Sequence, residues 1–211
     1  MAEVVGRIVT IFALALMAPL AGAQELAPDA LVKQVTGDVI AAVRQDKAIQ
    51  AGDSRKIAAL VETKILPHFD TRRATQLAMG ANCRRASAEQ QEELTREFTT
   101  LLVRTYSGAL SAYRDQAIVF RALRAAPADT EVTVYSQVKQ SGAEPIAIEY
   151  DLAKTGAQWK VFDIRVSGIS LVATYRSSFN EEVRTHGIDG LIQALASKNR
   201  QGPVKPVSRA M

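Results

Sequence analysis

The segment from Trp159 to Val183 most constrains the fold of this chain, because it joins two different hydrophobic periods across one short break. The first part, 159–166, is dense in β-branched and aromatic residues, as a buried strand is, and the part after Ser167-Gly168 repeats apolar residues at helical spacing. Inside the strand the apolar phase changes faces between Val161 and Phe162. This change predicts a β-bulge or strong curvature. A curved sheet with a helix lying across it can enclose a cavity.

Helical periodicity dominates the chain before this segment. Apolar stripes predict amphipathic helices over residues 28–50 and 53–66 and a short helix over 70–80. The capping-box pattern of Ser87–Gln90 predicts the start of the longest helix. That helix is apolar on more than half of its circumference towards its C-terminal end, as expected if the sheet lies on one side and other helices, or a cavity, on the other.

Four strands follow the longest helix, with turn residues between them. They are expected at Gln116–Arg124, Glu131–Lys139, Pro145–Ala153 and Gln158–Val166. The short turns favour an antiparallel meander, and a closing helix is expected around 188–195. This order predicts an α+β fold in which one curved four-stranded antiparallel sheet carries helices on its dry face and encloses an apolar cavity.

The two ends of the chain differ in composition from the middle. Residues 1–23 resemble a signal peptide, with an apolar run and an A-x-A cleavage pattern at its end; an uncleaved membrane anchor is the alternative, but the run is short and Pro19 interrupts it. Residues 24–197 are then expected to form a single domain without net charge. Residues 198–211 hold four basic residues and no acidic one, so the net charge of +4 lies in this segment. It is expected to be disordered, either as a solvated end or with weak attraction to anionic lipid headgroups.

Residues suited to catalysis are few. His68 and His186 are the two histidines and Cys83 the one cysteine, so a metal site has little support and no internal disulfide can form. A base and nucleophile pair of His68 and Cys83 is much less favoured than an ordinary turn histidine and a half-buried thiol. For Asp163, an ion pair with Arg165 on the wet face of the sheet is favoured over a general base at a cavity mouth. Nucleic-acid binding is not expected, because the basic residues do not gather with aromatic residues on a folded face.

The segment from Trp159, with Tyr175-Arg176 and Phe179, resembles the signature of the MlaC (toluene-tolerance Ttg2-like) family. Further matching segments are 69–80, 88–91 and 98–106, and the resemblance covers roughly residues 30–197. Members of this family are periplasmic proteins that carry phospholipids between the two membranes of Gram-negative bacteria. The resemblance implies an architecture similar to the nuclear-transport-factor-2-like fold, no enzyme activity, and no cofactor other than phospholipid carried as cargo. Cys83 departs from the family, which usually has a large aromatic residue near this point.

A lipid carrier needs a dry sleeve for the acyl chains and leaves the charged headgroup outside, because burial of an unpaired phosphate is costly. The apolar residues expected to line the sleeve, each of which could instead be ordinary core, are Leu77, Leu102, Tyr106, Leu110, Tyr113, Val134, Ile148, Tyr150, Val166, Ile169, Val172, Tyr175 and Phe179. The basic residues that could lie near the headgroup at the mouth, or else on exposed helix faces, are Arg104, Arg114, Arg176 and Arg184.

The resemblance also implies partners. It implies a periplasmic monomer that exchanges a glycerophospholipid with an inner-membrane ABC transporter complex bearing an MCE-domain subunit, and with an outer-membrane lipoprotein associated with a porin, so that outer-membrane lipid asymmetry is maintained. Three alternatives stay open: a carrier of another lipid such as a hopanoid, an enzyme that uses Asp163 or Tyr150 as acid or base on an apolar substrate, and an interaction module with a solid core.

Overall fold

The computed structural model describes residues 26–126, 128–140 and 142–201, so the expected leader and residues 202–211 of the expected tail lie outside the described residues. The helical segments are α1 (Pro28–Gln45), α2 (Lys47–Gln50), α3 (Ser54–Leu60), a π-helix (Val61–Ile65), a 3₁₀ turn (Leu66–His68), α4 (Thr71–Met79), a second 3₁₀ turn (Gly80–Arg85), α5 (Ala88–Tyr106), α6 (Gly108–Ser111), a third 3₁₀ turn (Ala173–Tyr175) and α7 (Arg176–Arg200). The strands are β1 (Ala117–Phe120), β2 (Glu131–Lys139), β3 (Ile146–Thr155), β4 (Gln158–Val166) and β5 (Ile169–Ser170). Among the helices of the described residues, none has the length and apolar content to cross a membrane.

The strands form one open antiparallel sheet in the order β1-β2-β3-β4-β5. The prediction of an α+β fold with a single antiparallel sheet is confirmed, but the count of four strands misses β5. Ser167 and Gly168 have φ values of 50° and 79°, and positive φ at both central residues is the requirement of a type I′ hairpin turn. The pair therefore turns the chain back into a short edge strand before the helical segment begins.

The predicted bulge is present in β4. Leu152 of β3 lies opposite Val161, whereas the adjacent Asp151 lies opposite Asp163, so Phe162 is the extra residue. In a regular strand Val161 and Ile164, three positions apart, would point to opposite faces. The bulge places both in the same apolar cluster. The change of hydrophobic phase in the sequence is thus explained by one inserted residue.

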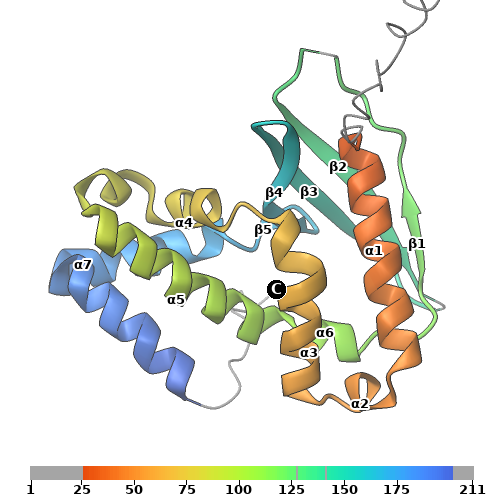
Figure 1. The fold of residues 1–211 in the computed structure, drawn as a ribbon, viewed down its shortest axis with the longest axis horizontal. Helices are drawn as coiled ribbons and strands as arrows, with labels where there is room; N and C mark the ends of the chain where they lie inside the picture. Colours follow the sequence, from red (N-terminus) through yellow and green to blue (C-terminus); the bar gives the residue numbers. More distant parts are fainter. Residues whose placement is uncertain (1–25, 127, 141, 202–211) are drawn as a thin grey trace, which may run out of the picture.

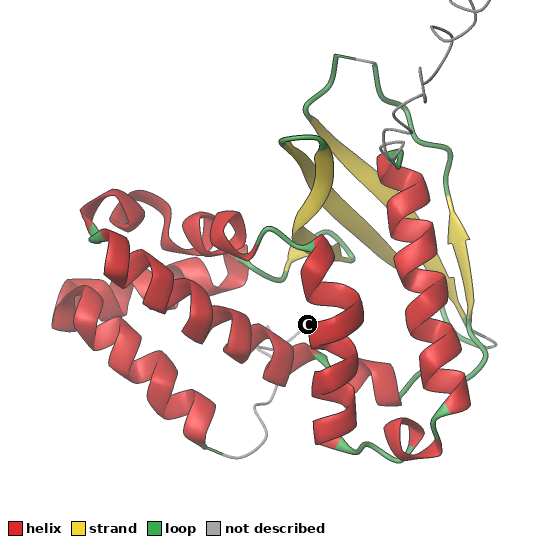
Figure 2. Cartoon of the chain, in the orientation of Figure 1, coloured by secondary structure: helices red, strands yellow, loops and turns green. Residues whose placement is uncertain are grey.

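The helices form two groups (Figure 1). Helix α1 lies in front of the sheet, while α4, α5 and α7 form a bundle on the other side of α3, away from the strands. Helix α7 packs on α5 and α4. The long helix α5 has its main contacts with other helices, and Figure 2 shows the helical bundle set to one side of the strands.

Three apolar clusters follow from this arrangement. The bundle core surrounds Phe98, whose ring meets those of Tyr175 and Phe179 edge-on with centroids 5.1 and 5.0 Å away. A second core joins α1 to the sheet around Val134 and Leu152, and a third joins α1, α2 and α3. The bundle is attached to the sheet where Phe69 forms a parallel bridge with Val161 and the Asp70 amide donates to the Val161 carbonyl at 2.8 Å.

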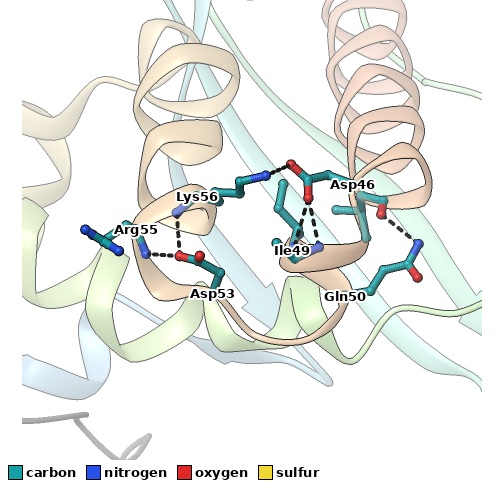
Figure 3. A network of polar contacts seen from close by, with 8 residues as sticks. Asp46, Ile49, Gln50, Asp53, Arg55 and Lys56 are labelled. Atoms are coloured by element: carbon teal, nitrogen blue, oxygen red, sulfur yellow. Dashed lines mark hydrogen bonds and ion pairs between the residues drawn. The ribbon is translucent and has the colours of Figure 1, made fainter.

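The corner between α1 and α3 shows why the first predicted helix divides in two (Figure 3). The Asp46 carboxylate accepts hydrogen bonds from the amides of Ala48 and Ile49, at 2.8 and 3.4 Å, and so begins the separate helix α2. The same carboxylate pairs with Lys56 of α3 at 2.7 Å. Asp53 caps α3, as the sequence predicts for this residue.

The remaining helix boundaries agree with the sequence at their caps. Asp70 caps α4, Gly80 ends it, and Ser87 with Gln90 forms the predicted capping box of α5. Helix α7 bends at Gly187, where φ is 74°, and then continues through the first three residues of the expected tail to Arg200. Asn199 anchors this end by donating to the carbonyl and the carboxylate of Glu97, at 2.9 and 2.8 Å.

Candidate functional site

Two apolar pockets adjoin each other beside the inner face of the sheet. The α5 pocket, about 220 Å³ in volume, lies among the π-helix, α4, the C-terminal half of α5, and β4 with the segment after it. The sheet pocket, about 480 Å³ in volume, lies between α1 and the inner faces of β1 to β4. Both pockets are walled by Ile65, Phe69, Leu110 and Ile164. The two spaces are therefore separated by four side chains rather than by a layer of the fold.

The structure brings seven of the expected lining residues to these walls. Leu102, Tyr106 and Val172 line the α5 pocket, Tyr113, Ile148 and Tyr150 line the sheet pocket, and Leu110 lines both. They come from α5, α6, β3 and the segments that follow α6 and β5. The apolar breadth of α5 is thus explained, since one face packs in the bundle and another borders a pocket.

The other expected lining residues lie outside both pockets. Tyr175 and Phe179 are packed around Phe98 in the bundle core, with Leu77 against the same core, and Val134 is buried between α1 and the sheet. Val166 is half-buried at the end of β4. Ile169 in the edge strand β5 is 53% exposed. Helical spacing alone does not distinguish these residues from those that border open space.

The sequence analysis missed part of the walls. Helix α1 supplies Val32, Val35 and Val39 to the sheet pocket, and the 61–69 segment supplies walls to both. The apolar stripe of α1 is visible in the sequence, and its breadth could have indicated that this helix borders a pocket. The π-helix has no such signal, because its i, i+5 hydrogen bonding is set by packing rather than by a residue pattern.

The arginines expected near a headgroup are engaged by other groups of the chain. Arg176 donates to the Leu77 carbonyl from Nε and Nη2, at 3.1 and 2.8 Å, and so satisfies the C-terminal end of α4. Arg114 donates to the carbonyls of Ser111 and Tyr113, Arg104 to the carbonyl of Gln201, and Arg184 pairs with Glu181. Of these, Arg104 and Arg114 each follow a pocket-lining residue, Val103 of the α5 pocket and Tyr113 of the sheet pocket.

Asp163 places a carboxyl group in the wall of the α5 pocket. Its carboxylate accepts from the Val172 amide at 3.3 Å, and the residue is 4% exposed. Burial raises the pKa of the Asp163 carboxyl, against hydrogen bonds from Ser170 and the Val172 amide that act to lower it. The prediction of an ion pair with Arg165 is wrong: the Arg165 guanidinium binds Glu149 at 2.6 Å and Asp151 at 2.9 Å.

Two tyrosines of the pockets, Tyr106 and Tyr150, have raised pKa values. Burial raises the pKa of Tyr106, with the neighbouring Tyr175 adding to the effect, and burial raises the pKa of Tyr150. Tyr150 lines the sheet pocket and Asp163 the α5 pocket, so these two residues do not share one pocket.

Within the described ranges no group of three or more His, Cys, Asp or Glu residues is placed to hold a metal ion. Cys83 is half-buried against the bundle core.

The fold and the pockets define an α+β protein with adjoining apolar spaces and few polar groups inside them, the construction of a binding site for an apolar ligand. Residues 33–197 match the family described as MlaC protein, and the chain belongs to that family.

Relatives agree with this assignment. The chain is 23% identical, over 87% of its length and 85% of the relative's, to the intermembrane phospholipid transport system binding protein MlaC of Haemophilus influenzae. It is 26% identical, over 50% of its length and 49% of the relative's, to the toluene tolerance protein ttg2D of Pseudomonas putida. A phospholipid-binding protein of Ralstonia solanacearum, solved in complex with a phospholipid, superposes with a TM-score of 0.77 at 39% identity, covering 82% of this chain and 97% of that one.

Proposed function

We propose that this protein is a periplasmic carrier that binds one glycerophospholipid by its acyl chains and shuttles it between the inner and outer membranes. The observation that carries the proposal is the pair of adjoining apolar pockets in a chain 39% identical to a phospholipid-bound protein. The acyl chains would occupy the pockets, each methylene contributing about 0.8 kcal/mol relative to water. The bilayer offers the acyl chains the same apolar environment. The pockets therefore allow a lipid to move from the bilayer to the protein without strongly favouring that movement.

The same proposal includes location and partners. Export would follow cleavage of residues 1–23, leaving a monomeric domain over 24–197 with a basic C-terminal segment. The carrier would exchange lipid with an inner-membrane ABC transporter complex bearing an MCE-domain subunit and with an outer-membrane lipoprotein–porin complex, and so help maintain outer-membrane lipid asymmetry. The family assignment and the names of the relatives support this part of the proposal.

Catalysis is not part of the proposed function. An enzyme acting in these pockets would need an acid and a base that face one substrate, whereas Asp163 and Tyr150 line different pockets. The Asp163 carboxylate is also engaged by the backbone at Val172. Alanine at both positions should leave lipid transfer between vesicles intact, and loss of transfer in a folded variant would favour the enzyme alternative.

The direct test is native mass spectrometry of the mature chain, expressed from Gln24, followed by lipid extraction. We expect a stoichiometric mass increase that extracts as a phospholipid. A bound hopanoid would replace the cargo in the proposal. A protein mass without lipid, unchanged after incubation with phospholipid vesicles, would contradict the carrier function and favour a module with a solid core.

A further inference from the structure

A third pocket, lined mainly by polar and charged residues, continues from the α5 pocket at the surface between α4 and α5. It is about 460 Å³ in volume, and we call it the Arg72 groove. Its own lining residues are Arg72, Gln91, Glu92, Thr95, Arg96 and Thr100. Leu66, Thr71 and Thr99 line both the groove and the α5 pocket. The α5 pocket therefore adjoins a groove whose lining residues are mainly polar, with no secondary-structure element between the two.

Helix α5 supplies one face to both spaces. Thr95 and Thr99 face the groove, and Leu102 and Tyr106, at the next steps of three and four residues, face the α5 pocket. One face of the helix thus changes from polar to apolar at Thr99. Thr95 and Tyr106 lie about 16 Å apart along the helix axis, at 1.5 Å per residue, which is a length suited to a headgroup followed by part of an acyl chain.

The groove offers donors that the protein itself does not use. The Arg72 guanidinium makes one long hydrogen bond, 3.4 Å to Gln91 Oε1, and forms no ion pair with any of the described residues. The hydroxyls of Thr71 and Thr99 have no hydrogen-bond partner in the described part of the chain. Arg96, in contrast, is already paired with Glu93 at 3.1 Å and Glu97 at 3.6 Å. The available cation at the mouth is therefore Arg72.

We propose that the Arg72 groove binds the phosphodiester of the phospholipid headgroup while the acyl chains enter through the α5 pocket, an inference that rests on the proposed function. Arg72 would make charge-assisted hydrogen bonds to the phosphate, and the hydroxyls of Thr71 and Thr99 would donate to it. Glu92 places a carboxylate in the same groove, so a headgroup that carries an ammonium is favoured over an anionic one. The arginines first expected at the mouth are not part of this site.

The test compares two lipids that share acyl chains and differ in phosphate. Delipidated wild type, Arg72→Gln and Thr99→Val are incubated with vesicles containing phosphatidylethanolamine and, separately, diacylglycerol, and bound lipid is quantified by native mass spectrometry. We expect Arg72→Gln to lower the affinity for phosphatidylethanolamine about tenfold, as for a lost hydrogen bond to a charged group, and to leave diacylglycerol binding unchanged. Thr99→Val should act in the same direction with a smaller effect, and Arg84→Gln, an exposed arginine outside the pockets, is the matched control.

The outcomes separate this inference from the function on which it rests. Wild type that takes up neither lipid would overturn both. If wild type binds phosphatidylethanolamine and Arg72→Gln keeps the wild-type ratio of bound phosphatidylethanolamine to bound diacylglycerol, the headgroup site in the groove is overturned and the carrier function is not. If Arg114→Gln lowers that ratio instead, the headgroup lies near the sheet pocket. Inorganic phosphate that binds lipid-free wild type, but not Arg72→Gln, as tightly as the lipid does would make the groove a free-phosphate site and contradict a headgroup site. Equal melting temperatures of all variants show that the fold is intact.

Discussion

At the scale of single residues, Asp163 connects pH to stability. Burial raises the pKa of its carboxyl above the ordinary value of 3.8, so the folded state binds this proton more readily than the unfolded state does. Stability therefore decreases as the pH rises from about 3.8 through the folded-state pKa, and the penalty of the buried charge is present in full above that value.

Asp163→Asn removes this titration and keeps an acceptor for the Val172 amide. We expect the unfolding free energy of the variant, relative to wild type, to increase with pH across this window and then to stay constant. Asp29→Asn is the control of opposite sign, because the hydrogen bond from Lys33 lowers the pKa of Asp29 and its contribution is lost as the pH falls. Urea titrations between pH 3 and pH 8 measure both differences, and a flat Asp163→Asn difference would mean that the carboxylate is not penalised by burial.

Phe179 tests whether an aromatic residue is core or pocket wall. Its ring meets Phe98 and Tyr175 in the bundle core and lies outside both pockets. We expect Phe179→Leu to lower the unfolding free energy by about 1–3 kcal/mol, since a cavity is left in packed surroundings. Lipid bound per folded molecule should not change. Reduced lipid with unchanged stability, measured by native mass spectrometry and urea unfolding, would instead place Phe179 in the lipid-binding wall.

At the scale of elements, the short helix α6 contributes Leu110 to the walls of both pockets. Leu110→Trp adds volume where the two spaces meet, and overpacking of this kind costs about 1–3 kcal/mol, or roughly a five- to hundredfold loss of lipid affinity. Ile169→Trp is the matched control, because Ile169 in the edge strand β5 is exposed and lies outside the pockets. Fluorescent-lipid binding measures both variants. Equal losses would show that the lipid does not occupy the space beside α6.

At the scale of the whole molecule, the α5 pocket lies between the bundle and the sheet, which are also attached around Phe69 and Val161 and by the ion pair of Arg73 in α4 with Glu131 in β2. A lipid in this pocket would contact both parts and should stabilise the protein. For free lipid at about a hundred times its Kd, the gain is about 2.7 kcal/mol, or roughly 5–10 °C in Tm for a domain of this size. Differential scanning calorimetry of loaded and delipidated protein checks this. An unchanged Tm would contradict binding in a pocket shared by the two parts.

Local signals in the sequence determined much of the fold. The caps at Asp53, Asp70 and Ser87 and the bulge at Phe162 were predictable, because each depends on residues close together in the chain. Alternation likewise located the strands of one antiparallel sheet. The strand β5 was missed, although a Ser-Gly pair between two apolar β-branched residues is itself a hairpin signal.

Tertiary structure alone decided which apolar residues border open space. Leu102 and Phe179 have the same character in the sequence, yet one lines a pocket and the other is packed around Phe98. The same holds for charge: Arg176 satisfies the end of α4, whereas Arg72 is left available beside a pocket. Periodicity states which face of an element is apolar, but a void exists only where neighbouring elements fail to fill the space between them. That failure depends on contacts between residues distant in the chain, so the sequence determined the elements and the packing determined the site.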